Sequence, residues 1–407
     1  MFTNSFNNCI TLTGIYDQAT TLKTMPGLKK ESALSNKPYF IALLILSCVI
    51  FSCKEKKEWI VPSEEVKLKI DVVTDSISVP FGMAFLPDGQ MLVTDRPSGE
   101  IIIVGVNNGK KTVVKGVPKV VTEGDGGMLD VLPHPDFAQN NLIFFAYAFQ
   151  DEKGGTLAVE SAKLKYDSLS ERTRVFTARP YYKKYNFFGS RLLLKDGFLF
   201  ITTGVNKTYQ DSAQLLTNHL GKIMRVKEDG SVPEDNPFVK VKGALPEIWG
   251  LGVRNPQGLT LNPYTQEIWE NEHGPKGGDE VNIIKPGKNY GWPVITYGLE
   301  YDGTPVGEGI TQREGMEQPL YYYVPSIAPS GMEFYTGNSF PMWKGNLFIG
   351  AMVLRHLNRL VIKDNKVVHE ERLLKDQKWR VRCVKQGPEG FLYIGVDGGM
   401  ILRIRPD

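Results

Sequence analysis

The sequence predicts an all-β protein built as a six-bladed β-propeller. Six units recur along the chain, and in each an alternating apolar run leads into a turn of Asp, Asn, Gly or Pro and then into a second apolar or aromatic run. Turn chemistry of this kind is typical of β-hairpins. The units cover residues 81–95, 127–148, 190–204, 257–272, 331–351 and 384–397. Recurring hairpins with few helix-period segments between them favour radially repeated antiparallel sheets; a pair of β-sandwiches is the alternative.

The two ends of the repeat region are candidates for closing the ring. Residues 66–73 (VKLKIDVV) and 400–406 (MILRIRP) both alternate in character, and pairing them in one blade would leave no open edge. In a closed ring the loops at one end of the central channel converge. We therefore expect residues that are far apart in the sequence to meet there, the candidates being Arg254, Gly274, Arg380 and Arg382.

The composition is that of a soluble globular protein. The chain has 407 residues, with 41 Gly and 25 Pro that indicate many turns, and its formal net charge is only +3. This charge gives no indication of a nucleic-acid partner. No glycine-rich loop follows a strand and opens a helix, which argues against nucleotide cofactors, and no zinc-type Cys/His spacing is present.

The N-terminal part is predicted to be a signal segment, residues 1–53. Lys37 precedes an apolar run, residues 39–46, that is too short to span a membrane. The run leads to Ile50-Phe51-Ser52-Cys53, which resembles a bacterial lipobox with a lipidated Cys; an ordinary signal peptide or a short anchor is the alternative. We expect residues 54–65 to be a tether and 66–407 the propeller domain. The prediction is an exported periplasmic or cell-surface lipoprotein, attached to the membrane only through its lipidated N-terminus.

Cysteine usage fits this prediction. Cys9 and Cys48 would leave with the signal, and Cys53 would carry lipid, so that Cys383 is the remaining thiol. No disulfide then forms within one chain. The fold must be held by its core and sheets, with a bound metal as a further stabilising element.

The stretch from Glu247 to Pro293 is the most informative part of the sequence. Five acidic residues surround a turn-rich segment, residues 273–278, that can be neither helix nor regular strand; they are Glu267, Glu270, Glu272, Asp279 and Glu280. Carboxylate and carbonyl oxygens on such a loop suit Ca²⁺, although a solvated acidic loop is the alternative. Arg254 and Asn255 lie just upstream and supply fork-shaped donors.

Nine motifs in order resemble the soluble quinoprotein sugar dehydrogenases, also called glucose/sorbosone or aldose sugar dehydrogenases. The resemblance covers the chain from about residue 66. The motifs are VPFGMAFLPDGQMLVTDR, EGDGGMLDVLPHPDF, FGSRLLL, HLGKIMRVKEDGSVPEDNPF, PEIWGLGVRNPQGL, EHGPKGGDEVN, NYGWPVITYG, APSGMEFY and WRVRCVKQGPEGFLYIGVD. The resemblance implies a six-bladed propeller that uses pyrroloquinoline quinone (PQQ) and Ca²⁺, with a small-molecule sugar as substrate and an external electron acceptor.

The resemblance also implies roles for matching residues. Arg254 and Asn255 match a pair that contacts the cofactor and the substrate. The carbonyls of Gly274 and Pro275 match those that hold the cofactor's Ca²⁺. A second, structural Ca²⁺ site is matched by Asp279, Glu280 and Tyr290.

Two further arginines, Arg380 and Arg382, match the family's arginines that pair with the cofactor carboxylates. Their i, i+2 spacing on a strand places both on one face. Since PQQ carries three carboxylates, guanidinium groups and Ca²⁺ suit it electrostatically.

Departures from the family pattern fall on the chemistry. Phe187 occupies the position of the family's proton-accepting His, so the catalytic residue of this chain is unknown from the sequence. Three other polar positions of the family are Val205, Val253 and Val353. General-base catalysis is commonly worth 10²–10⁴ in rate, so weakened oxidation of an aldose or related alcohol is expected.

Two other functions stay open. A non-catalytic ligand-binding propeller would keep the scaffold without the reaction. A Ca²⁺-dependent lactonase-like hydrolase would need a ring of carboxylate and Asn side chains at the channel, which the sequence does not supply.

Overall fold

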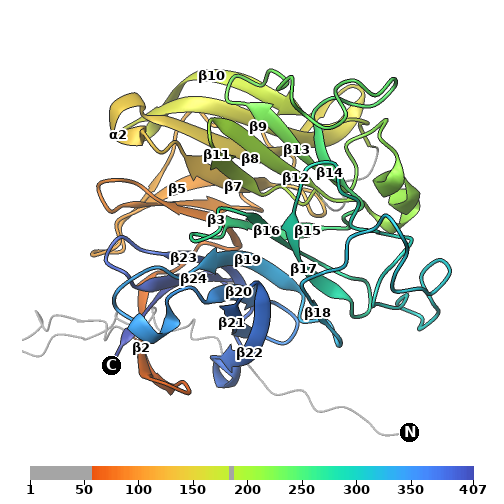
Figure 1. The fold of residues 1–407 in the computed structure, drawn as a ribbon. Helices are drawn as coiled ribbons and strands as arrows, with labels where there is room; N and C mark the ends of the chain where they lie inside the picture. Colours follow the sequence, from red (N-terminus) through yellow and green to blue (C-terminus); the bar gives the residue numbers. More distant parts are fainter. Residues whose placement is uncertain (1–56, 183–187) are drawn as a thin grey trace, which may run out of the picture. The chain divides into compact units, whose positions relative to one another are not determined.

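The computed structural model describes residues 57–182 and 188–407. The predicted signal segment and Phe187 lie outside the described residues, and the signal segment stays a prediction. Within the described residues the chain forms six antiparallel sheets (Figure 1). One strand of each sheet contacts the corresponding strands of both neighbouring sheets, so that six inner strands close a ring; they are β3, β7, β11, β15, β19 and β23. The predicted six-bladed propeller is confirmed.

Five of the sheets follow the chain in order, each with four strands. Their bounds are β3 (Pro80–Phe85), β4 (Met91–Asp95), β5 (Glu100–Val104) and β6 (Lys111–Val113); β7 (Met128–Pro133), β8 (Leu142–Asp151), β9 (Gly154–Lys165) and β10 (Ser168–Thr177); β11 (Leu192–Lys195), β12 (Phe198–Thr203), β13 (Lys222–Lys227) and β14 (Ile248–Leu251); β15 (Pro256–Leu261), β16 (Ile268–Glu272), β17 (Asp279–Ile284) and β18 (Tyr321–Tyr323); and β19 (Pro329–Phe334), β20 (Leu347–Ala351), β21 (His356–Lys363) and β22 (Lys366–Leu373).

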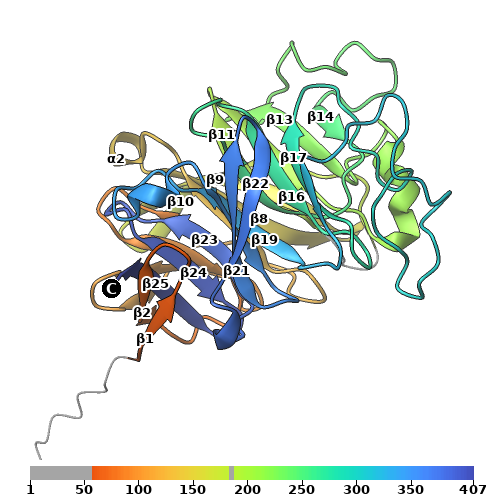
Figure 2. The ribbon, with the colours of Figure 1, turned by 60° about the horizontal axis from the view of Figure 1, so that its bottom comes forward.

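The sixth sheet closes the ring with strands from both ends of the described chain. It has the order β1 (Glu58–Pro62), β2 (Lys67–Thr74), β25 (Met400–Pro406), β24 (Leu392–Val396) and β23 (Val381–Gln386). The antiparallel pairing of β2 with β25 confirms the predicted closure; β1, β2 and β25 lie side by side in Figure 2. The folded domain begins before residue 66, because Glu58–Pro62, which the sequence placed in the tether, pairs with β2.

Helical structure in the described residues is short. It comprises α2 (Phe137–Asn140) and the 3₁₀ helices η1 (Lys207–Gln214), η2 (Pro341–Trp343) and η3 (Lys375–Gln377). None of the described helices has the length and apolar character needed to cross a membrane.

Each predicted hairpin unit corresponds to the two inner strands of a sheet. The first unit, β3 and β4, shows why such a sequence forms a hairpin. In the turn between β3 and β4, Gly89 has φ +80°, a conformation that glycine adopts without steric cost. Its N–H donates to Leu86 O at 3.0 Å, while Asp88 Oδ1 accepts the Gln90 N–H at 2.9 Å. The Pro-Asp-Gly sequence therefore specifies this turn locally.

The hydrophobic core lies between neighbouring sheets. On β12, Leu199 and Ile201 pack toward the second sheet, where they meet Phe144, while Phe200 packs on the opposite side with Leu259 of the fourth. Successive side chains of a strand point to opposite faces, and here both faces are covered by another sheet. Cys383 is a free, buried thiol in this core.

A buried arginine joins the N-terminal hairpin to the fifth sheet. The side chain of Arg359 on β21 is 1% exposed; its Nε donates to Glu371 Oε2 at 2.7 Å and its Nη1 to Glu65 Oε2 at 2.8 Å. Glu371 Oε1 also accepts the Glu64 N–H at 2.8 Å. Glu371 thus bridges β21 and the loop between β1 and β2.

We expect Glu371→Gln to lower the unfolding free energy by about 1–2 kcal/mol, because a neutral amide accepts a weaker hydrogen bond from a buried guanidinium. Urea unfolding followed by Trp fluorescence measures this. Glu314→Gln in an exposed loop is the control. Equal stability of the two variants would contradict the bridging role.

Candidate functional site

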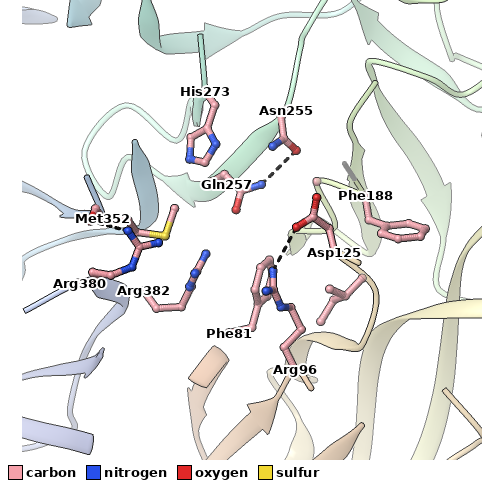
Figure 3. A pocket seen from close by; sticks show the side chains of 12 residues that line it. Phe81, Arg96, Asp125, Phe188, Asn255, Gln257, His273, Met352, Arg380 and Arg382 are labelled. Atoms are coloured by element: carbon pink, nitrogen blue, oxygen red, sulfur yellow. Dashed lines mark hydrogen bonds and ion pairs between the residues drawn. The ribbon is translucent and has the colours of Figure 1, made fainter. Parts of the chain in front are cut away.

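A cavity of about 260 Å³ opens at the end of the channel where the inner strands begin. Four of the residues that line it are each the second residue of an inner strand: Phe81 in β3, Leu129 in β7, Gln257 in β15 and Arg382 in β23. The cavity is lined by Phe81, Arg96, Asp125, Leu129, Phe188, Gly189, Asn255, Gln257, His273, Met352, Arg380 and Arg382 (Figure 3). Residues from all parts of the ring therefore meet at this mouth.

The structure brings some of the predicted site residues together here and places others next door. Asn255, Arg380 and Arg382 line the cavity itself. Arg254 is buried beside it, and its Nη1 donates to His273 O at 3.0 Å and to Gly274 O at 2.9 Å. Of the four residues expected to meet, Arg380 and Arg382 line this cavity, whereas Arg254 and Gly274 are bonded to each other beside it.

An acidic residue fixes the two predicted arginines. Asp397 Oδ2 accepts bonds from Arg382 Nη2 at 2.7 Å and Arg380 Nε at 3.2 Å, and Oδ1 accepts one from Arg382 Nε at 2.9 Å. Burial opposes ionisation of Asp397, but hydrogen bonds and charge from Arg382 and Arg380 hold its pKa below the ordinary value. The arginines are thereby oriented before any ligand arrives. Asp397 follows β24, so its role depends on the strand pairing of the sixth sheet.

Sequence reasoning missed a third guanidinium. Arg96 follows β4, whose end lies beside the start of β3, and it lines the cavity with Arg382. Burial and then the charge of Arg382 lower the pKa of Arg96. Its Nη1 lies 3.8 Å from Asp125 Oδ1. The position of Arg96 at the end of the first hairpin unit is the signal that could have found it.

His273 is held as a neutral ring between the main cavity and the acidic loop. Its Nε2 lies 2.7 Å from Pro329 O, and burial together with the nearby Arg254 lowers its pKa to about 3. Because the pairing with a carbonyl requires Nε2–H, Nδ1 carries the lone pair.

The loop from Gly274 to Gly278 folds tightly on itself. A Cβ at Gly274 would collide with the carbonyl oxygen of Gly277, so this position requires glycine. Gly274 and Pro275 line a groove of about 530 Å³ beside the main cavity, with Tyr301 and Val353 on its other walls. His273 lines both spaces.

Asp279, predicted as a metal ligand, anchors this loop. Its Oδ1 accepts the Gly274 N–H at 2.9 Å. Its Oδ2 accepts Ser326 Oγ at 2.7 Å, the Ile327 N–H at 2.8 Å and the Ala328 N–H at 2.9 Å. Four donors therefore occupy this carboxylate.

The other predicted metal residues surround a very small cavity. Glu280 and Tyr290 line it together with Glu272 and Gly274, and its volume of about 10 Å³ matches about one water-sized probe. The Tyr290 hydroxyl is already used, since it donates to Ile283 O at 3.0 Å and accepts the Lys285 N–H at 2.7 Å.

The carboxylates here are buried close to one another. Glu272 Oε2 accepts the N–H groups of Arg254 and of Asn255, the latter at 3.2 Å. Burial is the main cause that raises the pKa of Glu272, to about 7. Burial and the charge of Glu272 raise the pKa of Glu270 and Glu280.

These carboxylates fit a cation only with help from other ligands. Among residues 57–182 and 188–407, no three Asp, Glu, His or Cys side chains converge into a group that could hold a metal ion. A cation at this point would therefore take the carboxylates of Glu272 and Glu280 and complete its shell with backbone carbonyls or water, which are ligands that Ca²⁺ accepts. The buried Glu270 Oε1 has no hydrogen-bond partner among the described residues, so negative charge here is not fully compensated.

The positions that depart from the family pattern differ in their surroundings. Val205 is buried in an apolar cluster with Trp292, and Val253 is buried in another with Tyr290. Val353 is 55% exposed at the groove. Phe187 lies outside the described residues, and its neighbour Phe188 lines the cavity.

The site as a whole is a cationic cavity in a propeller. Three guanidiniums, those of Arg96, Arg380 and Arg382, line it, and the acidic partners that the structure gives them are Asp125 and Asp397. Such a set suits a polyanionic ligand with planar carboxylates.

Comparisons with known proteins show which family of propeller proteins the chain belongs to. The glucose / sorbosone dehydrogenase family model matches residues 77–403, and the chain belongs to this family. The chain is 40% identical over 364 residues to aldose sugar dehydrogenase YliI of Escherichia coli (strain K12), covering 87% of this chain and 96% of that protein. It is 29% identical over 267 residues to quinoprotein glucose dehydrogenase B of Acinetobacter calcoaceticus, covering 58% and 55%.

A solved structure shares the fold closely. The soluble aldose sugar dehydrogenase of Escherichia coli, crystallised in its apo-form, superimposes with a TM-score of 0.80 at 39% identity and covers 84% of this chain and 100% of that one.

Proposed function

We propose that the protein oxidises an aldose or a related alcohol with PQQ and Ca²⁺ and passes the electrons to an external acceptor. The observation that carries the proposal is the convergence of Arg96, Arg380 and Arg382 on one cavity, with Asp397 orienting two of them. When bound, PQQ supplies the oxidant that accepts two electrons from the substrate carbon.

The chain's own residues would bind and orient the reactants. Arg380 and Arg382 present donors for cofactor carboxylates, and Asn255 presents an amide at the same mouth. The Gly274 and Pro275 carbonyls lie on the adjoining groove, where they are available to a cation. Glu280 and Glu272 flank the smaller cavity that we assign to a structural Ca²⁺.

Two features lead us to propose a weakened enzyme. Phe187 takes the place of the family's proton-accepting His, and Val205 is packed among apolar side chains where a polar partner would be expected. Neither side chain can accept a proton. The protein would act as an exported lipoprotein, anchored through Cys53, on small-molecule sugars.

The second candidate is a ligand-binding propeller without turnover, favoured by the same loss at Phe187. One experiment separates the two. The purified chain from Lys54 onward is titrated with PQQ and Ca²⁺, followed by absorbance, and dye reduction is then measured across a panel of aldoses. We expect Ca²⁺-dependent binding of the quinone and slow turnover. Quinone binding without turnover of any aldose would favour the binding propeller, and absence of quinone binding would refute the proposed function.

A further inference from the structure

Asp125 bears the only carboxylate among the described residues that line the main cavity. It lies in the loop between β6 and β7, and its side chain is 44% exposed. Its contact with Arg96, 3.8 Å from Oδ1 to Nη1, is an ion pair that exceeds hydrogen-bond distance. Figure 3 shows the carboxylate directed between Arg96 and Asn255. Its oxygens therefore remain open toward the cavity.

The other lining groups are poorer proton acceptors. Guanidiniums are donors only, and the amides of Asn255 and Gln257 are neutral and bonded to each other at 3.1 Å. The imidazole of His273 is committed through Nε2 to Pro329 O at 2.7 Å. Phe188 and Met352 complete the wall without an acid–base group.

We propose that Asp125 accepts the proton of the hydroxyl that is oxidised, in the place of the family's His. This inference rests on the proposed function. Oxidation at the anomeric carbon breaks its C–H bond and the O–H bond and forms C=O. The hydride would carry the electron pair to the quinone that the proposed function supplies as oxidant, and the proton would pass to a carboxylate oxygen of Asp125.

The arrangement would allow the slow turnover expected above to proceed without the His. Arg96 is near enough to orient the carboxylate but does not occupy it with a short hydrogen bond. A carboxylate can serve as a general base when it reaches the hydroxyl in the bound state, and such help is worth about 10²–10⁴ in rate.

The test variant is Asp125→Asn, which keeps the shape of the side chain but cannot accept a proton. Asp125→Glu keeps the carboxylate. Asp364→Asn, in the exposed turn between β21 and β22, is the control. Quinone affinity is measured by absorbance titration, independently of turnover. The rate of aldose oxidation is then measured against pH, with and without added formate as an external base.

We expect Asp125→Asn to bind the quinone within about threefold of the parent and to lose about a hundredfold or more in rate. Its rate should lose the acid-side dependence on pH and should recover in part with formate. Asp125→Glu should retain part of the rate, and Asp364→Asn all of it.

Three results would overturn the assignment. A rate for Asp125→Asn within threefold of the parent would place the base elsewhere, with His273 as the next candidate. A parallel loss of quinone affinity would show that Asp125 acts only by holding Arg96. Failure of the parent chain itself to bind the quinone would refute the proposed function and this assignment together, whereas the first two results leave the proposed function intact.

Discussion

Without calcium, the protein should be most stable near pH 4.5 and should lose about 3 kcal/mol of unfolding free energy as the pH rises to about 7.5. The cause is the buried acidic cluster of Glu270, Glu272 and Glu280, close to the Gly274 loop. Glu272 has its pKa raised from 4.5 to about 7, mainly by burial, and Glu270 and Glu280 are raised in the same direction. One pKa unit corresponds to about 1.4 kcal/mol.

The sign follows from proton binding in the two states. Below pH 4.5 these carboxyls are protonated in both the folded and the unfolded chain. Between pH 4.5 and about 7 the unfolded chain releases the Glu272 proton while the folded chain keeps it, so stability falls as the pH rises through this window. Asp397, whose pKa is lowered, acts in the opposite sense and loses its contribution as the pH falls below its ordinary value.

Calcium should reverse the loss above pH 7, because a cation replaces the protons as the partner of these carboxylates. A ligand that binds only the folded state at a hundredfold excess over its Kd adds about 2.7 kcal/mol. Urea unfolding at pH 5.5, 6.5 and 7.5, with Ca²⁺ or with a chelator, measures both effects.

Glu280→Gln is the matched variant. It should raise metal-free stability at pH 7.5, since the cost of burying or protonating that carboxyl is gone, and it should remove most of the response to Ca²⁺. Glu314→Gln in an exposed loop should behave as the parent. Metal-free stability that stays flat or rises between pH 5.5 and 7.5 would contradict the account, as would an unchanged Ca²⁺ response in Glu280→Gln.

The fold was predictable because its signals are local. Turns such as Pro87-Asp88-Gly89 are fixed by the residues within them, and the alternation of Leu199, Phe200 and Ile201 is visible in the sequence. The edge strand β1 was missed, since Glu58–Pro62 ends in proline and follows a Lys-rich run, and only its pairing with β2 reveals it.

The site was predictable in part for the same reason. Arg380 immediately precedes β23 and Arg382 is its second residue, so their i, i+2 spacing brings both to the same cavity. Arg96 follows β4 of the first sheet and Asp125 lies in the loop that leads from that sheet to the second, so their meeting depends on the packing of these two neighbouring sheets. Asp279 matched a metal-ligand position by motif, and only the structure shows that four donors already occupy it.

Arg382→Gln should weaken quinone binding by about a hundredfold or more. The side chain of Arg382 is 8% exposed and is held by two bonds to Asp397, so its guanidinium is already oriented toward the cavity. Removing one partner of a desolvated charge pair costs about 2–5 kcal/mol, because the other charge is left unpaired. Absorbance titration with PQQ at fixed Ca²⁺ and ionic strength measures the loss, with Arg313→Gln in an exposed loop as the control.

Asp397→Asn separates the effect of orienting the two guanidiniums from the effect of their charge. It leaves both guanidiniums in the site but weakens the bonds that align them, so we expect a smaller loss, about tenfold. In the double variant Arg382→Gln/Asp397→Asn the two losses should not add, since Asp397 acts on the ligand largely through Arg382. Quinone affinity of Arg382→Gln within threefold of the parent would show that the cofactor does not use this end of the channel. Additive losses would mean that Asp397 acts chiefly through Arg380, which it also contacts.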